Sequence, residues 1–248
     1  MTYVEVLRAR RLLFWIAAIV ALQVVLAVWS LLSSHGHVDR PSAIPMTWLL
    51  AIGGIGPLIA ASFLGGNISA EGTTLAILWT RPATRTAIAW RYFAVDAVAM
   101  LLAYLIVLAG EVLIAAFVGV ANRLWFDSGS AGTIAIVLSG SFMLYAYIRL
   151  GSARLTGRGG VLAGAIWAAM FLVPGLAHLP LPAPFHLPLV GLEYVSPLTW
   201  IGSLGGSEHH NADASVVGLS VGWRALVAAV IAIVALVASV QLWVTREA

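Results

Sequence analysis

The sequence has no cysteine and no lysine, and only 9% of its 248 residues are charged. The absence of cysteine excludes disulfides, thiolate catalysis and cysteine metal sites. The absence of lysine excludes the phosphate-binding loop of ATPases, because the pattern Gly-x-x-x-x-Gly-Lys-Ser/Thr requires that residue. Soluble domains usually carry about 25% charged residues, so one water-soluble core does not fit this composition.

The chain is rich in apolar residues, which make up 61% of the sequence. A membrane-spanning helix needs about 20 apolar residues, and runs of this kind recur along the chain. We therefore predict an all-α integral membrane protein with a single transmembrane domain, residues 1–248. The six predicted spans are residues 12–32, 46–64, 92–118, 133–149, 160–177 and 223–244.

The first apolar run, residues 12–32, follows a charged segment, as a secretory signal peptide would. A signal peptide has an apolar core of only about 7–15 residues and a cleavage site of small residues. This run is longer and is followed by no convincing Ala-x-Ala site, so we interpret it as a retained first span.

All 13 basic residues are arginine, and their distribution predicts the orientation of the chain. Only Arg40, Arg123 and Arg224 fall on one side of the predicted spans. The other side holds Arg8, Arg10, Arg11, Arg81, Arg85, Arg91, Arg149, Arg154, Arg158 and Arg246. Cytoplasmic loops are enriched in arginine, so both termini are expected in the cytosol. This positive charge indicates contact with anionic lipid rather than nucleic acid.

The six histidines all lie in predicted outer connections. A metal or pH-sensing site is one interpretation, because imidazole binds metals and titrates near neutral pH. Their clusters lack the spacing of zinc sites, so we favour ordinary polar loop residues and expect no metal. The histidines are His35, His37, His178, His186, His209 and His210. The alanine-rich, lysine-free composition is typical of a GC-rich bacterial genome, which predicts a bacterial inner membrane.

The connection between the second and third spans carries the most informative local pattern; we refer to residues 66–90 as the elbow. Glu71 suits the start of a short helix, where the helix dipole is positive. Leu75, Leu78 and Trp79 have the spacing of one apolar helix face. Pro82 favours an extended conformation at the preceding residue and ends the helix. An amphipathic helix lying across the cytosolic end of the bundle is expected.

This order of an acidic residue, Gly-Thr, a hydrophobic turn and Thr-Arg-Pro-x-x-Arg resembles the cytosolic elbow of ABC-2 type permeases, the membrane subunits of type-2 ABC exporters. In that family the segment contacts the ATPase subunit. The resemblance therefore implies ATPase coupling for Glu71, Gly72, Thr73, Leu75, Leu78, Arg81, Pro82 and Arg85, with Thr80 also matching. The uncharged elbow with Trp79 departs from the family pattern, and an interfacial helix without a partner is the alternative.

The resemblance also implies features along the rest of the chain. A short amphipathic helix is expected at residues 1–13, and a partly re-entrant outer segment at residues 180–210, with outer-gate residues Glu193, Tyr194 and Pro197. From composition alone, Pro180, Pro182, Pro184 and Pro188 predict a stiff extended path at the start of that segment.

Polar and small residues within the spans give further hypotheses. Asp96 lies near the cytosolic end of the third span and is expected to reach the interface. Glu111 lies further along the same span. One interpretation is a polar point in the translocation path or in a contact between subunits; the other is an interfacial carboxylate near Arg123. Gly53, Gly54 and Gly56 permit close packing, and Pro57 a kink. The resemblance places Ile59, Phe63, Trp167, Met170 and Phe171 on an apolar path at the dimer interface; lipid-facing or packing surface is the alternative.

The leading functional hypothesis is a permease that exports an amphipathic or hydrophobic cargo such as a lipid, peptide or antibiotic by alternating access. The resemblance implies a separate ABC ATPase subunit, which would bind ATP and Mg²⁺, and a second permease copy or a homologous permease. The chain itself is then no enzyme and binds no cofactor. An intramembrane enzyme and a non-transporting immunity or scaffold protein are the alternatives.

Overall fold

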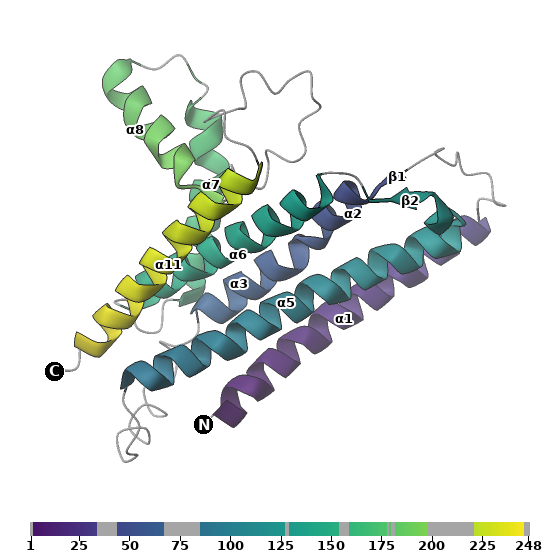
Figure 1. Ribbon diagram of the computed structural model, residues 1–248, viewed down its shortest axis with the longest axis horizontal. Coiled ribbons are helices and arrows are strands. Elements are labelled where there is room, and N and C mark those ends of the chain that lie inside the picture. Colours follow the sequence, from purple (N-terminus) through teal and green to yellow (C-terminus); the bar gives the residue numbers. More distant parts are fainter. Residues whose placement is uncertain are drawn as a thin grey trace.

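The structure, a computed structural model, describes residues 2–33, 44–66, 85–126, 129–153, 159–177, 179, 182–197 and 221–245. These residues are almost entirely helical (Figure 1). A short parallel pairing joins β1 (Ile44–Pro45) to β2 (Leu124–Trp125), next to a 3-10 turn, η2 (Ala121–Arg123). The helices are α1 (Thr2–Ser33), α2 (Met46–Gly53), α3 (Ile55–Gly66), α5 (Arg85–Val118), α6 (Ser130–Ser152), α7 (Gly159–Ala177), α8 (Ala183–Tyr194) and α11 (Val221–Thr245).

Within the described ranges, five helical stretches are long and apolar enough to cross a membrane. They match five of the six predicted spans and confirm the predicted all-α membrane-type fold. The predicted span at residues 160–177 corresponds to α7, in which the apolar stretch Gly160–Val173 is shorter, so its crossing stays a prediction. The five stretches are Val6–Ser33, Met46–Gly66, Thr86–Val118, Ser130–Ser152 and Gly222–Trp243.

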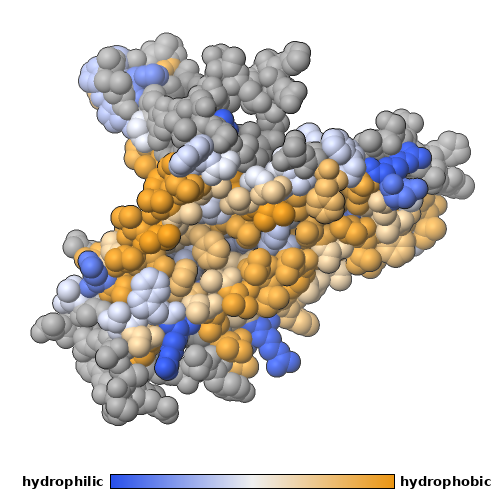
Figure 2. All heavy atoms as spheres, viewed as in Figure 1, coloured by the Kyte–Doolittle hydropathy of each residue, from blue (hydrophilic) through white to orange (hydrophobic). Residues whose placement is uncertain are grey.

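The outer surface of the bundle is apolar over its middle. Figure 2 shows hydrophobic residues along the helices, with hydrophilic residues gathered toward the ends. On α1, Trp15 is 65% exposed and Trp29 71% exposed. Monomeric soluble proteins rarely expose contiguous apolar surface of this extent, so the surface supports a multi-pass membrane protein. The start of α1 and the end of α11 lie toward the same end of the bundle (Figure 1).

The N-terminal residues are part of the first long helix. The separate short helix predicted at residues 1–13 is absent, because α1 runs without interruption from Thr2 to Ser33. No glycine or proline occurs in this range. Without either residue, nothing in the local sequence ends the helix between its charged start and its apolar part.

The second span is broken, as its proline predicted. A turn at Gly54 separates α2 from α3, and the Gly54 amide donates to the Ala51 carbonyl at 3.0 Å. Pro57 has no amide hydrogen, and its ring would clash with the carbonyl four residues earlier, that of Gly53. The helical hydrogen-bond pattern therefore restarts beyond Gly53.

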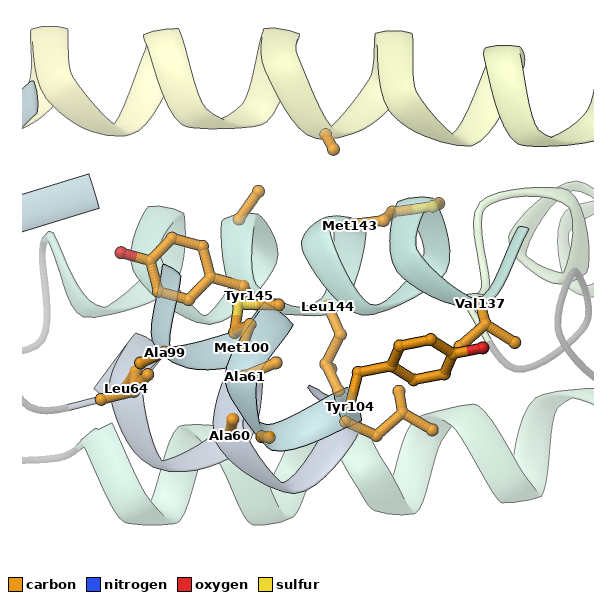
Figure 3. Packing of buried hydrophobic residues seen from close by; sticks show 14 of the residues in the cluster. Ala60, Ala61, Leu64, Ala99, Met100, Tyr104, Val137, Met143, Leu144 and Tyr145 are labelled. Carbon is orange, nitrogen blue, oxygen red and sulfur yellow. The ribbon is translucent and has the colours of Figure 1, made fainter. Parts of the chain in front are cut away.

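The centre of the core is α3, which packs against α5, α6 and α7. Figure 3 shows side chains of the three helices α3, α5 and α6 meeting. Small residues bring the backbones close together: a Cβ atom on Gly56 would lie 2.5 Å from the Ala103 carbonyl oxygen. The labelled core residues are Ala60, Ala61, Leu64, Ala99, Met100, Tyr104, Val137, Met143, Leu144 and Tyr145.

Gly56→Ala is therefore expected to destabilise the protein by about 1–3 kcal/mol, since the new methyl group overlaps backbone atoms, which cannot rotate away. The matched control is Gly164→Ala on α7, where a Cβ atom meets nothing within 4 Å. That change should be neutral or stabilise by up to about 1 kcal/mol. Thermal unfolding in detergent measures both, and equal melting temperatures would contradict the packing described.

The proline-rich segment after α7 is helical from Ala183 to Tyr194, so the prediction of an extended path up to Pro188 is wrong from Ala183 onward. Pro184 lies in the first turn of α8, where a missing amide hydrogen costs nothing, and Pro188 lies inside the helix. The amides of Phe185 and His186 donate to the Pro182 carbonyl at 2.9 and 3.1 Å. This start of a helix satisfies the donors that an extended path would have left to water.

Candidate functional site at the elbow end of the bundle

The elbow connects the end of α3 at Gly66 to the start of α5 at Arg85. Of the predicted coupling residues, Arg85 is the first residue of α5. The other seven lie outside the described residues, at positions 71–73, 75, 78, 81 and 82. What the structure describes is how the helices on both sides of the elbow are held.

The last carbonyls of α3 accept hydrogen bonds from two other helices. Arg8 of α1 donates from Nη2 to the carbonyls of Phe63 at 2.9 Å and Leu64 at 2.8 Å. Ser152 Oγ of α6 lies 3.2 Å from the Gly65 carbonyl oxygen and 3.0 Å from the Arg149 carbonyl oxygen of its own helix, so its single hydrogen is shared between the two acceptors. The final four carbonyls of a helix have no partner in the helix itself, and its negative end attracts a cation. The end of α3 is thus bound to α1 and α6.

An ion pair buried in the bundle joins α5 to α6. The Arg149 Nη2 atom lies 2.9 Å from Asp96 Oδ2, and the two side chains are 5% and 0% exposed. The Tyr145 hydroxyl donates to the same Oδ2 at 2.6 Å and accepts from Arg149 Nε at 2.7 Å. Tyr145 and Arg149 are four residues apart and therefore share one face of α6. The three side chains form a closed hydrogen-bonded triangle, which we call the Asp96 triad.

The Asp96 triad corrects two predictions. Asp96 was expected to reach the cytosolic interface, but its side chain is fully buried against α6. Arg149 was predicted to end the fourth span on the cytosolic side, but α6 continues to Ser152 and the Arg149 side chain is buried. An ionised residue inside a membrane span usually pairs with another one. Opposite charges near the same end of two consecutive spans, with a tyrosine four residues before the arginine, were the signal that would have identified this pair.

The predicted path residues on α3 and α7 come together only in part. Trp167 donates from Nε1 to Ser62 Oγ at 2.7 Å and stacks on Phe171, with 5.7 Å between ring centroids. Met170 is buried and Ile59 half-buried. Ser62, which the sequence analysis did not select, makes this polar contact between α3 and α7.

Two of the path residues point away from the core. Phe63 on α3 and Phe171 on α7 are 61% and 66% exposed. These side chains form an apolar outer surface in the single chain. Lipid or a second subunit would equally cover such a surface, so their role in a path stays a prediction.

Glu111 lies on α5 beside the contact with α1. A Cβ atom on the adjacent Gly110 would lie 2.2 Å from Val20 of α1, so the two helices touch closely there. Among the residues that the structure describes, half-buried Glu111 forms no ion pair. Its two predicted roles stay predictions: a polar point in the path or in a subunit contact, and an interfacial carboxylate.

The chain returns to α6 directly after α8. The Tyr147 hydroxyl donates to the Val195 carbonyl at 3.0 Å, and Ser196 and Pro197 are buried. Tyr147 is 17 residues beyond Ser130, the first residue of α6, which corresponds to about 25 Å along that helix. The predicted gate residues Glu193 and Tyr194 end α8 just before this contact. Whether residues 180–210 form a re-entrant segment stays a prediction, because residues 198–210 lie outside the described ranges.

An apolar cavity of about 230 Å³ lies between α5, α6 and α11. Its hydroxyl groups are already engaged: Tyr145 belongs to the Asp96 triad, and Ser139 donates to the Ile136 carbonyl at 3.2 Å. A hydrocarbon group fits such a lining, and nothing in it provides a nucleophile with a base. The lining residues are Phe93, Ser139, Phe142, Tyr145, Ala146, Ala229, Ala232, Ile233 and Leu236.

Comparison with known proteins returns no family model, no curated protein and no solved structure that matches this chain.

Proposed function

We propose that the chain is the membrane-spanning permease subunit of an ATP-driven exporter in a bacterial inner membrane, with both termini in the cytosol. A separate ATPase subunit supplies the energy, and an amphipathic or hydrophobic cargo moves outward. The observation that carries the proposal is the elbow pattern from Glu71 to Arg85, located between two helices that are both attached to the rest of the bundle.

The placement of the elbow supports a coupling role. The end of α3 is bound to α1 and α6, and α5 is bound to α6 through the Asp96 triad. Two ATPase subunits that approach each other on binding ATP would displace the elbows of two permeases. Because both flanking helices are attached to the bundle, that displacement would reach the membrane-spanning part and open the path outward.

The outer surfaces of α3 and α7 support assembly with a second permease, either a second copy or a homologous subunit. Phe63 and Phe171 are exposed there, and Trp167 ties the two helices together through Ser62. Sparse charge along the described helices favours a hydrophobic or amphipathic cargo over a small inorganic ion, since ion pathways are lined by polar and charged groups.

The two alternative functions lack this support. A serine-type intramembrane enzyme needs a hydroxyl next to a general base. Ser139 and Ser141 of α6 instead donate to carbonyls of their own helix, those of Ile136 and Val137. A scaffold or immunity protein would need no elbow pattern, and an ATPase partner distinguishes it from a transporter.

Co-purification tests the proposal. The wild-type chain is expected to retain an ATPase encoded next to it, and Glu71→Ala and Arg81→Ala should weaken that complex and its ATP hydrolysis by roughly tenfold or more, because each removes a charged contact worth about 1.5–3 kcal/mol. Asp39→Ala and Arg40→Ala are the matched controls, since they remove the same charges from the predicted outer side. The assignment fails if the elbow variants keep the complex and its turnover intact.

A further inference from the structure

The last third of α6, residues 145–152, contacts both helices that flank the elbow. Tyr145 and Arg149 hold Asp96 of α5, and Ser152 donates to the Gly65 carbonyl of α3. Residues 145, 149 and 152 follow one another at intervals of four and three, so they lie along one side of the helix. One short stretch of α6 is therefore attached to the chain both before and after the elbow.

The junction with α3 is a close backbone contact. A Cβ atom on Gly65 would lie 2.8 Å from Cβ of Ile148 and 3.2 Å from the Tyr145 carbonyl oxygen. Closely packed elements move together, because sliding one past the other opens voids and breaks contacts. The last turn of α3 is therefore expected to follow any displacement of α6.

The junction with α5 is electrostatic and buried. Asp96 is 11 residues after Arg85, about 16 Å along α5 from the end of the elbow. Solvent ions screen a buried pair much less than an exposed one. Separating Asp96 from Arg149 would leave each of the two buried charges without the other, which is strongly unfavourable. The pair therefore holds α5 in one register against α6.

The same stretch makes a third contact, with the segment that follows α8. Tyr147 donates to the Val195 carbonyl, in the segment that follows α8. Residues 145–152 thus contact α3, α5 and the segment beyond α8, which are distant from one another in the sequence.

We propose that this stretch of α6 transmits movement of the elbow to the bundle, and that Asp96, Tyr145 and Arg149 are positioning residues that keep α5 moving with α6. The inference rests on the proposed function, since it requires an ATPase acting on the elbow. With the triad intact, displacement at the elbow moves α3, α5 and α6 as one unit. Without the triad, α5 shifts against α6, and ATP is hydrolysed while the segment that follows α8 does not move.

The test uses the full complex of permease and ATPase in liposomes and needs no knowledge of the cargo. Leu192→Cys places a single thiol on an exposed position of α8 in a chain without cysteine. Two quantities are measured: ATP hydrolysis, and the ATP-induced change in the labelling rate of this thiol by a membrane-impermeant maleimide. A merely structural residue changes both in proportion to the amount of folded complex, whereas a positioning residue changes their ratio.

Four variants are compared in this background. In Asp96→Asn, and in the double variant Asp96→Leu with Arg149→Met, the labelling change per ATP hydrolysed should fall by about 5- to 150-fold, the usual range of coupling between sites. Arg149→Lys keeps the positive charge and should therefore retain part of the labelling change per ATP hydrolysed. Ser141→Ala is the control on α6, because that buried hydroxyl bonds only within its own helix.

The outcomes separate this inference from the proposed function. If the wild-type chain recruits no ATPase, the proposed function fails. If the wild type shows ATP-dependent labelling and the double variant keeps its full response, the transmission role is overturned. Loss of ATPase binding in the folded double variant would overturn it too, since the triad would then maintain the elbow itself rather than transmit its movement.

Discussion

Asp96→Asn is expected to lower the free energy of unfolding by about 3–5 kcal/mol, because it leaves the Arg149 guanidinium buried without its counter-charge. This is a large fraction of the total stability of a typical protein. The hydroxyl of Tyr145 also loses an ionised acceptor at 2.6 Å. Thermal and denaturant unfolding in detergent should both report the loss.

Removing both charges should cost much less than removing one. Replacing a buried ion pair by apolar residues of similar volume is often neutral or stabilising, so the double variant Asp96→Leu with Arg149→Met is expected to unfold near the wild-type midpoint. Glu111→Gln is the matched control on α5, since Glu111 forms no ion pair among the described residues. Equal destabilisation by Asp96→Asn and Glu111→Gln would contradict the role assigned to the pair.

Thr74→Cys is expected to give an all-or-none result in topology labelling. The single thiol, within the elbow, should not react with a membrane-impermeant maleimide added outside intact cells, and should react once the cells are permeabilised. The physical reason is the excess of arginine on the elbow side, which directs that side to the cytosol. The natural absence of cysteine makes any labelling specific to the introduced residue.

Ser128→Cys supplies the opposite outcome. In the sequence it lies between α5 and α6, in a connection predicted to be outside, so it should react in intact cells. Reversed labelling at the two positions would place the elbow outside, where no cytosolic ATPase reaches it, and the proposed function would fall with the orientation. Labelling of both from outside would show that α5, which lies between the two positions in the sequence, does not cross the membrane.

The regions where sequence reasoning failed have a common cause. At α8 the prolines predicted an extended path, yet Pro184 lies where a helix tolerates proline and the Pro182 carbonyl caps the first turn. At residues 1–13 a separate helix was expected, yet α1 is continuous. Both predictions took the character of a short segment as decisive. The actual conformation depended on whether the backbone donors of that segment found acceptors.

The Asp96 triad shows the same limit for functional residues. Asp96 and Arg149 are 53 residues apart in sequence, and each taken alone fits the interface near its span end. Their pairing needs α5 and α6 side by side in one register. That register depends on how α3 packs between them, through contacts such as Gly56 with Ala103 and Gly65 with Ile148. No local pattern contains this information.

By itself, the sequence determined the class of this protein: the apolar runs that become membrane-length helices, the break before Pro57 and the small residues for close packing, because each follows from local hydropathy or backbone chemistry. Only the tertiary structure decided which charges are buried together and which carbonyls they bind. Arg8 reaches the end of α3, Arg149 reaches Asp96, and Tyr147 reaches Val195. These partners are chosen by helix packing, which brings distant residues together after the helices have formed.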